Sequence, residues 1–223
     1  LFLENYTWMI YTLETIKKLK NVNWIVKQHP TEDWIPSKKF NFSLLAREME
    51  KNYNHIRLLP SYINPSSLIK FTDVAITSQG SVGVEYPSFG IPSIVAENSY
   101  YTNLGFTLEP KNITEYKNLL KKTHKINKLD KQKIEKAKVC LFIFNILLKN
   151  RISFMPEFVP QFCNRMTIAN ENKFFYQLSQ ILKKFNPDND QFKKMFIKQL
   201  QLKLRNTINF DICSIKNKIL NDY

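Results

Sequence analysis

The sequence predicts an α/β fold in which half of a doubly wound, mostly parallel sheet is followed by a mainly helical region. Three observations predict it. Short apolar runs alternate with helical patterns in the first half of the 223 residues, an order typical of parallel strands covered by helices. All four glycines lie within residues 80–105, and beyond residue 112 the spacing is helical almost throughout. We therefore expect an α/β domain over residues 1–111 and a helical, basic region over residues 112–223.

The first two expected elements are a helix and a short strand. Apolar residues between positions 9 and 19 recur at helical spacing, which predicts a helix that ends at Asn21. Residues 24–26 form an apolar run that predicts a buried strand. This strand must stop by His29 and Pro30, because proline cannot continue a strand ladder.

A second helix and strand follow. Residues 42–52 keep helical spacing and residues 56–59 form another short apolar run. Asn64 followed by Pro65 has the pattern of an N-cap with proline at the first helical position, so a short helix is expected there. Residues 74–77 form the third expected strand.

A glycine-bounded helix connects the last two strands. Gly80 begins a turn, residues 81–89 predict a helix, Gly90 closes it, and residues 91–96 return to strand. Four strands separated by helices indicate a parallel sheet covered on both faces.

The rest of the chain predicts helices over residues 113–122, 130–149, 171–185 and 188–205. Asp130 and Asp188 are the expected N-caps of two of them. The apolar run at 139–148 is much shorter than the roughly 20 residues that a membrane span needs, so a buried helix is expected.

The net charge of +14 belongs to the second part of the chain. Residues 1–110 contain ten basic and ten acidic side chains, whereas residues 111–223 contain 23 basic and 9 acidic ones. Such a charge suits nucleic acid, an anionic membrane or an acidic polymer, and a composition biased by an AT-rich genome explains it equally well. No zinc-finger, RRM-like or helix-turn-helix pattern is present, so we expect no nucleic-acid partner.

The last predicted helix mixes apolar and basic residues. They are Phe192, Met195, Phe196, Ile197 and Leu200 among Lys193, Lys194, Lys198, Lys203 and Arg205. This mixture favours either peripheral contact with an anionic membrane surface or a solvated lysine face on a packed helix.

Cysteine usage favours a reducing, cytoplasmic compartment. Cys140, Cys163 and Cys213 are widely spaced and form no CxxC pair, which disfavours a disulfide scaffold or a zinc site. No metal and no cofactor are expected. The chain begins with Leu1 rather than Met, and regular structure starts within a few residues, which favours a piece of a longer polypeptide.

A glycine and serine turn is the first candidate site. Ser78, Gly80, Ser81 and Gly83 follow the third strand where a helix begins. Glycine permits sharp turns and close ligand approach, and a helix N-terminus at the carboxyl end of a parallel strand suits a phosphate. The alternative is that the two serines only cap the helix.

Three charged or titratable residues complete the predicted site. Lys27 and His29 leave the first strand at the same expected sheet edge, where both can meet phosphate. Glu85 lies about one helical turn beyond Ser81, where its carboxylate can accept from ribose hydroxyls. The alternatives are a structural histidine and a glutamate that complements the helix dipole.

The sequence resembles capsular polysaccharide synthesis glycosyltransferases in three motifs. N-V-N-W-I-V-K-Q-H-P is similar to the strand and His-Pro motif of the capsule Kdo transferases and, more distantly, of bacterial sialyltransferases. S-V-G-V-E-Y-P-S-F-G-I-P is similar to their serine-rich phosphate loop, and N-S-Y-Y-T-N-L-G-F-T to the tyrosine-then-glycine loop that follows. The likeness covers roughly residues 5–120. It implies phosphate binding by His29, nucleotide contact by Glu85, and a Rossmann-like C-terminal half of a GT-B fold.

The resemblance implies a cytoplasmic transferase that moves a sugar from a CMP- or UDP-linked donor to a glycan or lipid-linked acceptor. Gln28 replaces a usual proline or histidine and Gln79 interrupts a usual serine or threonine pair, so the donor stays open. No catalytic base is assigned, because in this family it usually comes from the N-terminal domain. The alternatives are a UDP-sugar 2-epimerase-like isomerase, since a related P-S-(L/F)-G-x-P pattern occurs there, and a non-catalytic binding module.

Overall fold

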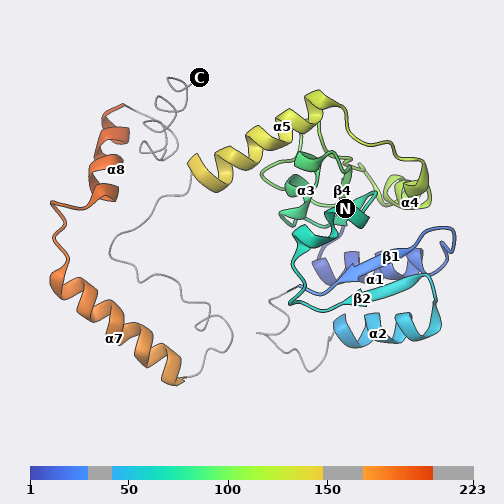
Figure 1. Cartoon of the computed structure of the whole chain (residues 1–223), viewed down its shortest axis with the longest axis horizontal. Coiled ribbons are helices and arrows are strands. Elements are labelled where there is room, and N and C mark those ends of the chain that lie inside the picture. Colours follow the sequence, from blue (N-terminus) through green and yellow to red (C-terminus); the bar gives the residue numbers. More distant parts are fainter. Residues whose placement is uncertain (30–41, 148–167, 203–223) are drawn as a thin grey trace. The chain divides into compact units, whose positions relative to one another are not determined.

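The computed structural model describes residues 1–29, 42–147 and 168–202 (Figure 1). These residues form a mixed α/β structure with two parallel two-stranded sheets. The chain divides into two compact units, Leu1–Leu141 and Phe142–Tyr223. The first unit holds every described strand and every predicted site residue.

The first strand pair forms as predicted. Its elements are α1 (Asn5–Ile16), β1 (Trp24–Lys27), α2 (Phe42–Asn52) and β2 (Ile56–Leu59). β1 pairs with β2 in parallel, with Trp24 opposite Ile56 and Lys27 opposite Leu59. Helix α1 ends at Ile16, earlier than predicted. The N–H groups of Lys18 and Leu19 donate to the carbonyl oxygens three residues before them, so the chain leaves the α-helical pattern in a tightened last turn.

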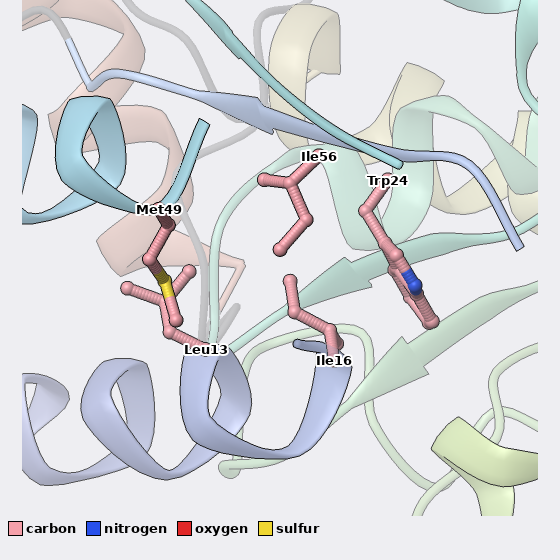
Figure 2. Packing of buried hydrophobic residues seen from close by; sticks show 5 residues of the cluster. All are labelled: Leu13, Ile16, Trp24, Met49 and Ile56. Atoms are coloured by element: carbon pink, nitrogen blue, oxygen red, sulfur yellow. The ribbon is translucent and has the colours of Figure 1, made fainter. Parts of the chain in front are cut away.

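One apolar cluster holds this pair to its helices. Leu13 and Ile16 of α1 and Met49 of α2 point toward Trp24 and Ile56 on the strands (Figure 2). All five side chains are buried, and burying each of them contributes roughly 1.5–3 kcal/mol.

The other face of the first pair is open in the described residues, contrary to the predicted two-sided cover. Ile25 is 46% exposed, and Arg57, its register partner, is exposed as well. In both strands the first residue is buried, the second is exposed and the last two are half-buried.

The second pair is also parallel. Its elements are η2 (Pro65–Phe71), β3 (Ala75–Thr77), α3 (Val82–Glu85), η3 (Pro87–Phe89) and β4 (Ser93–Val95). The pairing continues past the strand ends through Ala96 N–H to the Thr77 oxygen and Glu97 N–H to the Ser78 oxygen. Leu108 adds a parallel bridge on the outer side of β4.

The predicted helix over residues 81–89 is wrong as a single element. Pro87 has no N–H with which to continue the α-helical ladder, so α3 ends at Glu85 and a separate 3₁₀ turn, η3, follows. Gly90 closes this turn with φ 85°, the left-handed conformation that the sequence predicted for a helix-ending glycine.

The predicted single sheet is present as two pairs that share a core. No strand ladder joins the pairs within the described residues. Ile76 of β3 nevertheless packs against the cluster of β1 and β2. The parallel α/β class is therefore confirmed, whereas one continuous hydrogen-bonded sheet is not observed.

Two further helices pack within the first unit. α4 (Ile113–Lys121) places Tyr116 and Leu120 against Ile94 and Ala96, so this helix packs on one face of the second pair at β4. α5 (Lys131–Phe142) begins at Asp130, whose Oδ1 accepts from the Lys133 N–H at 2.9 Å, as the predicted N-cap requires. Between them lies η4 (Thr123–Lys125).

The apolar run at 139–148 is not a uniformly buried helix. α5 passes into a π-helical segment, η5 (Ile143–Leu147), and residues from 148 to 167 lie outside the described chain. Cys140 is buried, but Val139, Phe142 and Ile146 are exposed. The prediction of burial therefore fails for part of the run.

The second unit contains α7 (Ile168–Lys184) and α8 (Gln191–Gln201). The predicted N-cap at Asp188 is wrong by two residues. Asp190 Oδ2 accepts from the Lys193 N–H at 3.1 Å, whereas Asp188 pairs with the Lys193 ammonium at 2.8 Å.

Several predictions lie outside the described side chains. They concern Phe192, Met195, Lys203 and Arg205 of the last predicted helix and the two cysteines Cys163 and Cys213. Among the helices that the structure describes, none combines the length and apolarity needed to cross a bilayer.

Candidate functional site

The turn after β3 brings four predicted site residues together. The Gly80 N–H donates to the Thr77 Oγ1 at 2.9 Å, and the Gly83 N–H donates back to the Gly80 oxygen at 2.9 Å. A Cβ on Gly80 would stand 2.9 Å from the Thr77 hydroxyl oxygen, so the tight turn needs glycine there. Gln79, Gly80 and Ser81 are exposed.

Ser81 occupies the N-cap position of α3 without acting as a side-chain cap. Its hydroxyl makes no capping hydrogen bond, and the N–H groups of Ser81 and Val82 have no acceptor among the residues described. An exposed turn with two such donors suits an anion. Because α3 has a single turn, its dipole is weaker than that of a long helix.

Ser78 is engaged inside the fold. It is buried, and its hydroxyl donates to the Asn5 Oδ1 at 2.8 Å. A phosphate contact from this hydroxyl would require that hydrogen bond to break. Of the two serines, Ser81 is therefore the one exposed on the outer side of the turn.

Gly83 is required by packing rather than by ligand approach. A Cβ on this glycine would stand 2.2 Å from the Tyr101 hydroxyl oxygen and 2.5 Å from the Cζ. The same hydroxyl donates to the Gly80 oxygen at 2.6 Å. Tyr101 is fully buried, and burial raises the pKa of its hydroxyl to about 12.

Lys27 and His29 lie at the end of β1, on the other strand pair. The Lys27 ammonium is tied to backbone, donating to the Gln28 oxygen at 3.2 Å and to the Ser61 oxygen at 3.1 Å. His29 is exposed and is the last described residue before position 42. The lysine thus links the ends of β1 and β2.

Glu85 lies one turn after Ser81, as predicted, because its N–H donates to the Ser81 oxygen at 2.9 Å. Its carboxylate is one of three causes that raise the pKa of the Tyr100 hydroxyl: burial is the largest, followed by the nearby Cys140 thiol and then Glu85. The sequence analysis gave Tyr100 no role. The pair of adjacent tyrosines, Tyr100 and Tyr101, in the loop after β4 was the sequence signal that could have pointed to this residue.

The carboxyl end of β4 is held by the first residues of the chain. Glu97 Oε1 accepts from the Phe2 N–H at 2.8 Å and from the Leu1 nitrogen at 3.0 Å. Burial alone would raise the pKa of Glu97, but these hydrogen bonds outweigh it and lower the pKa. Together with the Ser78 to Asn5 bond, they place residues 1–5 over the carboxyl ends of β3 and β4.

Sequence reasoning overlooked one Asp-x-Asp sequence, residues 188–190, in the second unit. Its two carboxylates are used by Lys193, as described above, and the described residues contain no group of three or more His, Cys, Asp or Glu side chains placed for a metal. A neighbouring hollow of about 480 Å³ contains none of the predicted site residues. Its lining is Ile181, Lys184, Phe185, Asn186, Asn189 and Asp190.

No family model, curated protein or solved structure matches this chain.

Proposed function

We propose that this chain binds the phosphates of a nucleotide sugar and serves as the donor-binding half of a glycosyltransferase that builds bacterial surface polysaccharide. One observation carries the proposal. Gln79, Gly80 and Ser81 are exposed at the carboxyl end of a parallel strand, and the N–H groups of Ser81 and Val82 have no acceptor in the described chain. Ligands of parallel α/β folds bind at this edge.

The predicted residues then take separate roles. The Ser81 and Val82 N–H groups and the Ser81 hydroxyl hold phosphate oxygens. Lys27 and His29 stabilise the charge that develops on the departing nucleotide. Glu85, one turn into α3, accepts from the ribose hydroxyls.

The proposal extends to the architecture and the setting. The two parallel pairs belong to a Rossmann-like half of a GT-B fold, completed by a second half that supplies the catalytic base. The acceptor is a glycan or a lipid-linked glycan on the cytoplasmic side, and the basic α7 and α8 unit contacts the anionic membrane surface peripherally.

A nucleotide panel tests the proposal. The intact protein is titrated with CMP, UDP, a CMP-sugar and a UDP-sugar, and both the melting temperature and the heat of binding are measured. We expect one nucleotide class to raise the melting temperature, because a ligand stabilises the state to which it binds. Absence of binding by all four would overturn the proposal.

The product distinguishes the enzyme classes. Transfer of the sugar to an acceptor supports the glycosyltransferase, whereas release of an epimerised nucleotide sugar identifies an isomerase. Binding with neither product in the full-length protein identifies a non-catalytic module.

A further inference from the structure

Two exposed phenylalanines precede the strands of the second pair. Phe71 is 76% exposed and Phe89 is 63% exposed. Phe71 comes four residues before Ala75 of β3 and Phe89 four residues before Ser93 of β4, and these two strand residues are register partners. Because parallel strands begin at the same edge of a sheet, both phenylalanines lie at the amino edge of the pair. The proposed donor site lies at the opposite, carboxyl edge.

A lysine-rich segment, residues 121–133, lies along the same amino edge. Three contacts hold it there, each to a residue that precedes a strand. They join His124 Nδ1 to Asn21 Nδ2 before β1 at 3.3 Å, the Lys128 ammonium to the Thr72 oxygen before β3 at 3.1 Å, and the Leu129 N–H to the Gly90 oxygen before β4 at 2.9 Å. Thr72 and Gly90 directly follow the two phenylalanines, so the segment lies beside both of these aromatic residues.

The segment is strongly basic. Residues 121–133 contain six lysines and one acidic residue, and all six lysines are exposed. In the described chain, two of the six form ion pairs: Lys128 with Asp73 at 3.5 Å and Lys133 with Asp130 at 3.3 Å. Both pairs join exposed groups and therefore contribute little. The other four lysines leave this edge with a net positive charge.

Exposed phenylalanines beside exposed lysines suit the surface of an anionic bilayer. The apolar rings can enter the headgroup region while the ammonium groups remain with the lipid phosphates. A symmetric contact with a second copy would bring the lysines of one chain against those of the other, which opposes association through this edge. The sequence has no zinc-finger, RRM-like or helix-turn-helix pattern, which favours a lipid surface over nucleic acid.

We infer that the amino-edge surface, formed by Phe71, Phe89 and residues 121–133, docks on an anionic phospholipid bilayer. The phenylalanines enter the headgroup region and the lysines bind lipid phosphates. This contact is separate from the one proposed for α7 and α8, and it does not depend on nucleotide binding. It leaves the carboxyl edge of the strands facing away from the lipid, on the aqueous side from which a nucleotide arrives.

Vesicle sedimentation of the intact chain tests the inference. Vesicles of phosphatidylcholine alone are compared with vesicles of phosphatidylcholine and phosphatidylglycerol. We expect binding to the mixed vesicles only, and weaker binding as salt is added, because salt screens exposed charges. Absence of binding to the mixed vesicles overturns the inference, and binding to single-stranded RNA in its place would assign the surface to nucleic acid.

Charge reversal distinguishes this surface from the basic helices of the second unit. Lys125→Glu/Lys131→Glu alters the amino edge, and Lys183→Glu/Lys184→Glu makes the same change of charge on exposed lysines of α7. We expect the first variant to bind mixed vesicles roughly tenfold more weakly than the second, because each lysine at an anionic surface adds to the affinity. Equal losses, or a loss confined to the α7 variant, overturn the inference.

Removal of the aromatic rings tests the apolar part of the contact. Phe71→Ala/Phe89→Ala should bind mixed vesicles roughly fivefold more weakly, or worse, because apolar area no longer enters the headgroup region. Tyr62→Ala/Leu104→Ala is the matched control, since both side chains are exposed and follow β2 and β4 at the carboxyl edge. The melting temperatures of both variants should stay near that of the unaltered chain. Equal vesicle binding by the two variants contradicts insertion of the phenylalanines and overturns the inference.

Discussion

The hydroxyl of Ser78 donates a 2.8 Å hydrogen bond to the Oδ1 of Asn5, which joins the carboxyl end of β3 to the first turn of α1. The contact crosses 73 residues of sequence and is formed by a buried serine. Two serines that look equivalent in the sequence, Ser78 and Ser81, therefore have different surroundings.

Replacement of these two serines is expected to change the free energy of unfolding by different amounts. Ser78→Ala should lower the free energy of unfolding by about 1 kcal/mol, because the bonded Asn5 oxygen loses its donor. Ser81→Ala should change it by less than about 0.5 kcal/mol, since an exposed hydroxyl without a capping bond is removed. Urea denaturation measures both, and equal losses would contradict the different placement of the two side chains.

Replacement of His29 tests its predicted contact with phosphate. His29→Ala should remove the nucleotide-induced rise in melting temperature and leave the melting temperature of the free protein nearly unchanged, because the side chain is exposed. His124→Ala is the matched control, as His124 is exposed and its ring nitrogen is hydrogen-bonded to the Asn21 side chain at 3.3 Å. A large fall in the melting temperature of free His29→Ala would show a structural histidine instead.

A methyl group at Gly83 is expected to disrupt the turn. Gly83→Ala places a Cβ 2.2 Å from the Tyr101 hydroxyl oxygen and 2.5 Å from its Cζ, and the overpacking should destabilise the protein by about 1–3 kcal/mol. The double variant Gly83→Ala/Tyr101→Ala tests the cause, because removal of the ring opens the space. Its loss of stability should be smaller than the sum of the two single losses. Additive losses in thermal or urea unfolding would show that the close contact is not responsible.

Glu97 is expected to make the free energy of unfolding depend on pH in the acidic range. Its pKa in the folded chain lies below the ordinary value of 4.5. A carboxylate with a lowered folded pKa stabilises the fold above its unfolded pKa, and this stabilisation is lost as the pH falls through the folded value. Glu97→Gln should therefore be less stable than the unaltered chain at about pH 6, and the difference should shrink at about pH 3.5. Urea titrations at the two pH values would contradict this if the difference were constant.

Local sequence patterns predicted the elements well where the cause is local. The strands at residues 24–27 and 56–59 follow from short apolar runs, and Gly90 ends its helix in the left-handed conformation for which glycine is suited. Asn64 caps through its own side chain, which accepts from the Ser66 N–H at 2.9 Å. Each of these outcomes depends on residues only a few positions apart.

The predictions failed where a single atom or a distant residue decides. Pro87 interrupts a pattern whose apolar spacing continues to Phe89. Asp188 and Asp190 are equally good caps by composition, and only the backbone position of α8 selects Asp190. The bonds from Ser78 to Asn5 and from Tyr101 to Gly80 join elements that are far apart in sequence. No periodicity in the sequence predicts such contacts.

The position of the Lys27 ammonium limits what this lysine can add to anion binding. Because it already donates to the carbonyl oxygens of Gln28 and Ser61, a phosphate that recruits it must replace existing partners. The phosphate then only replaces other acceptors of this ammonium. The free energy of binding gained is therefore smaller than the gain from a lysine that is surrounded by water alone. The same exchange would break the hydrogen bond to the Ser61 oxygen, just after β2. An anion that binds at the end of β1 would therefore also free the backbone that follows the neighbouring strand.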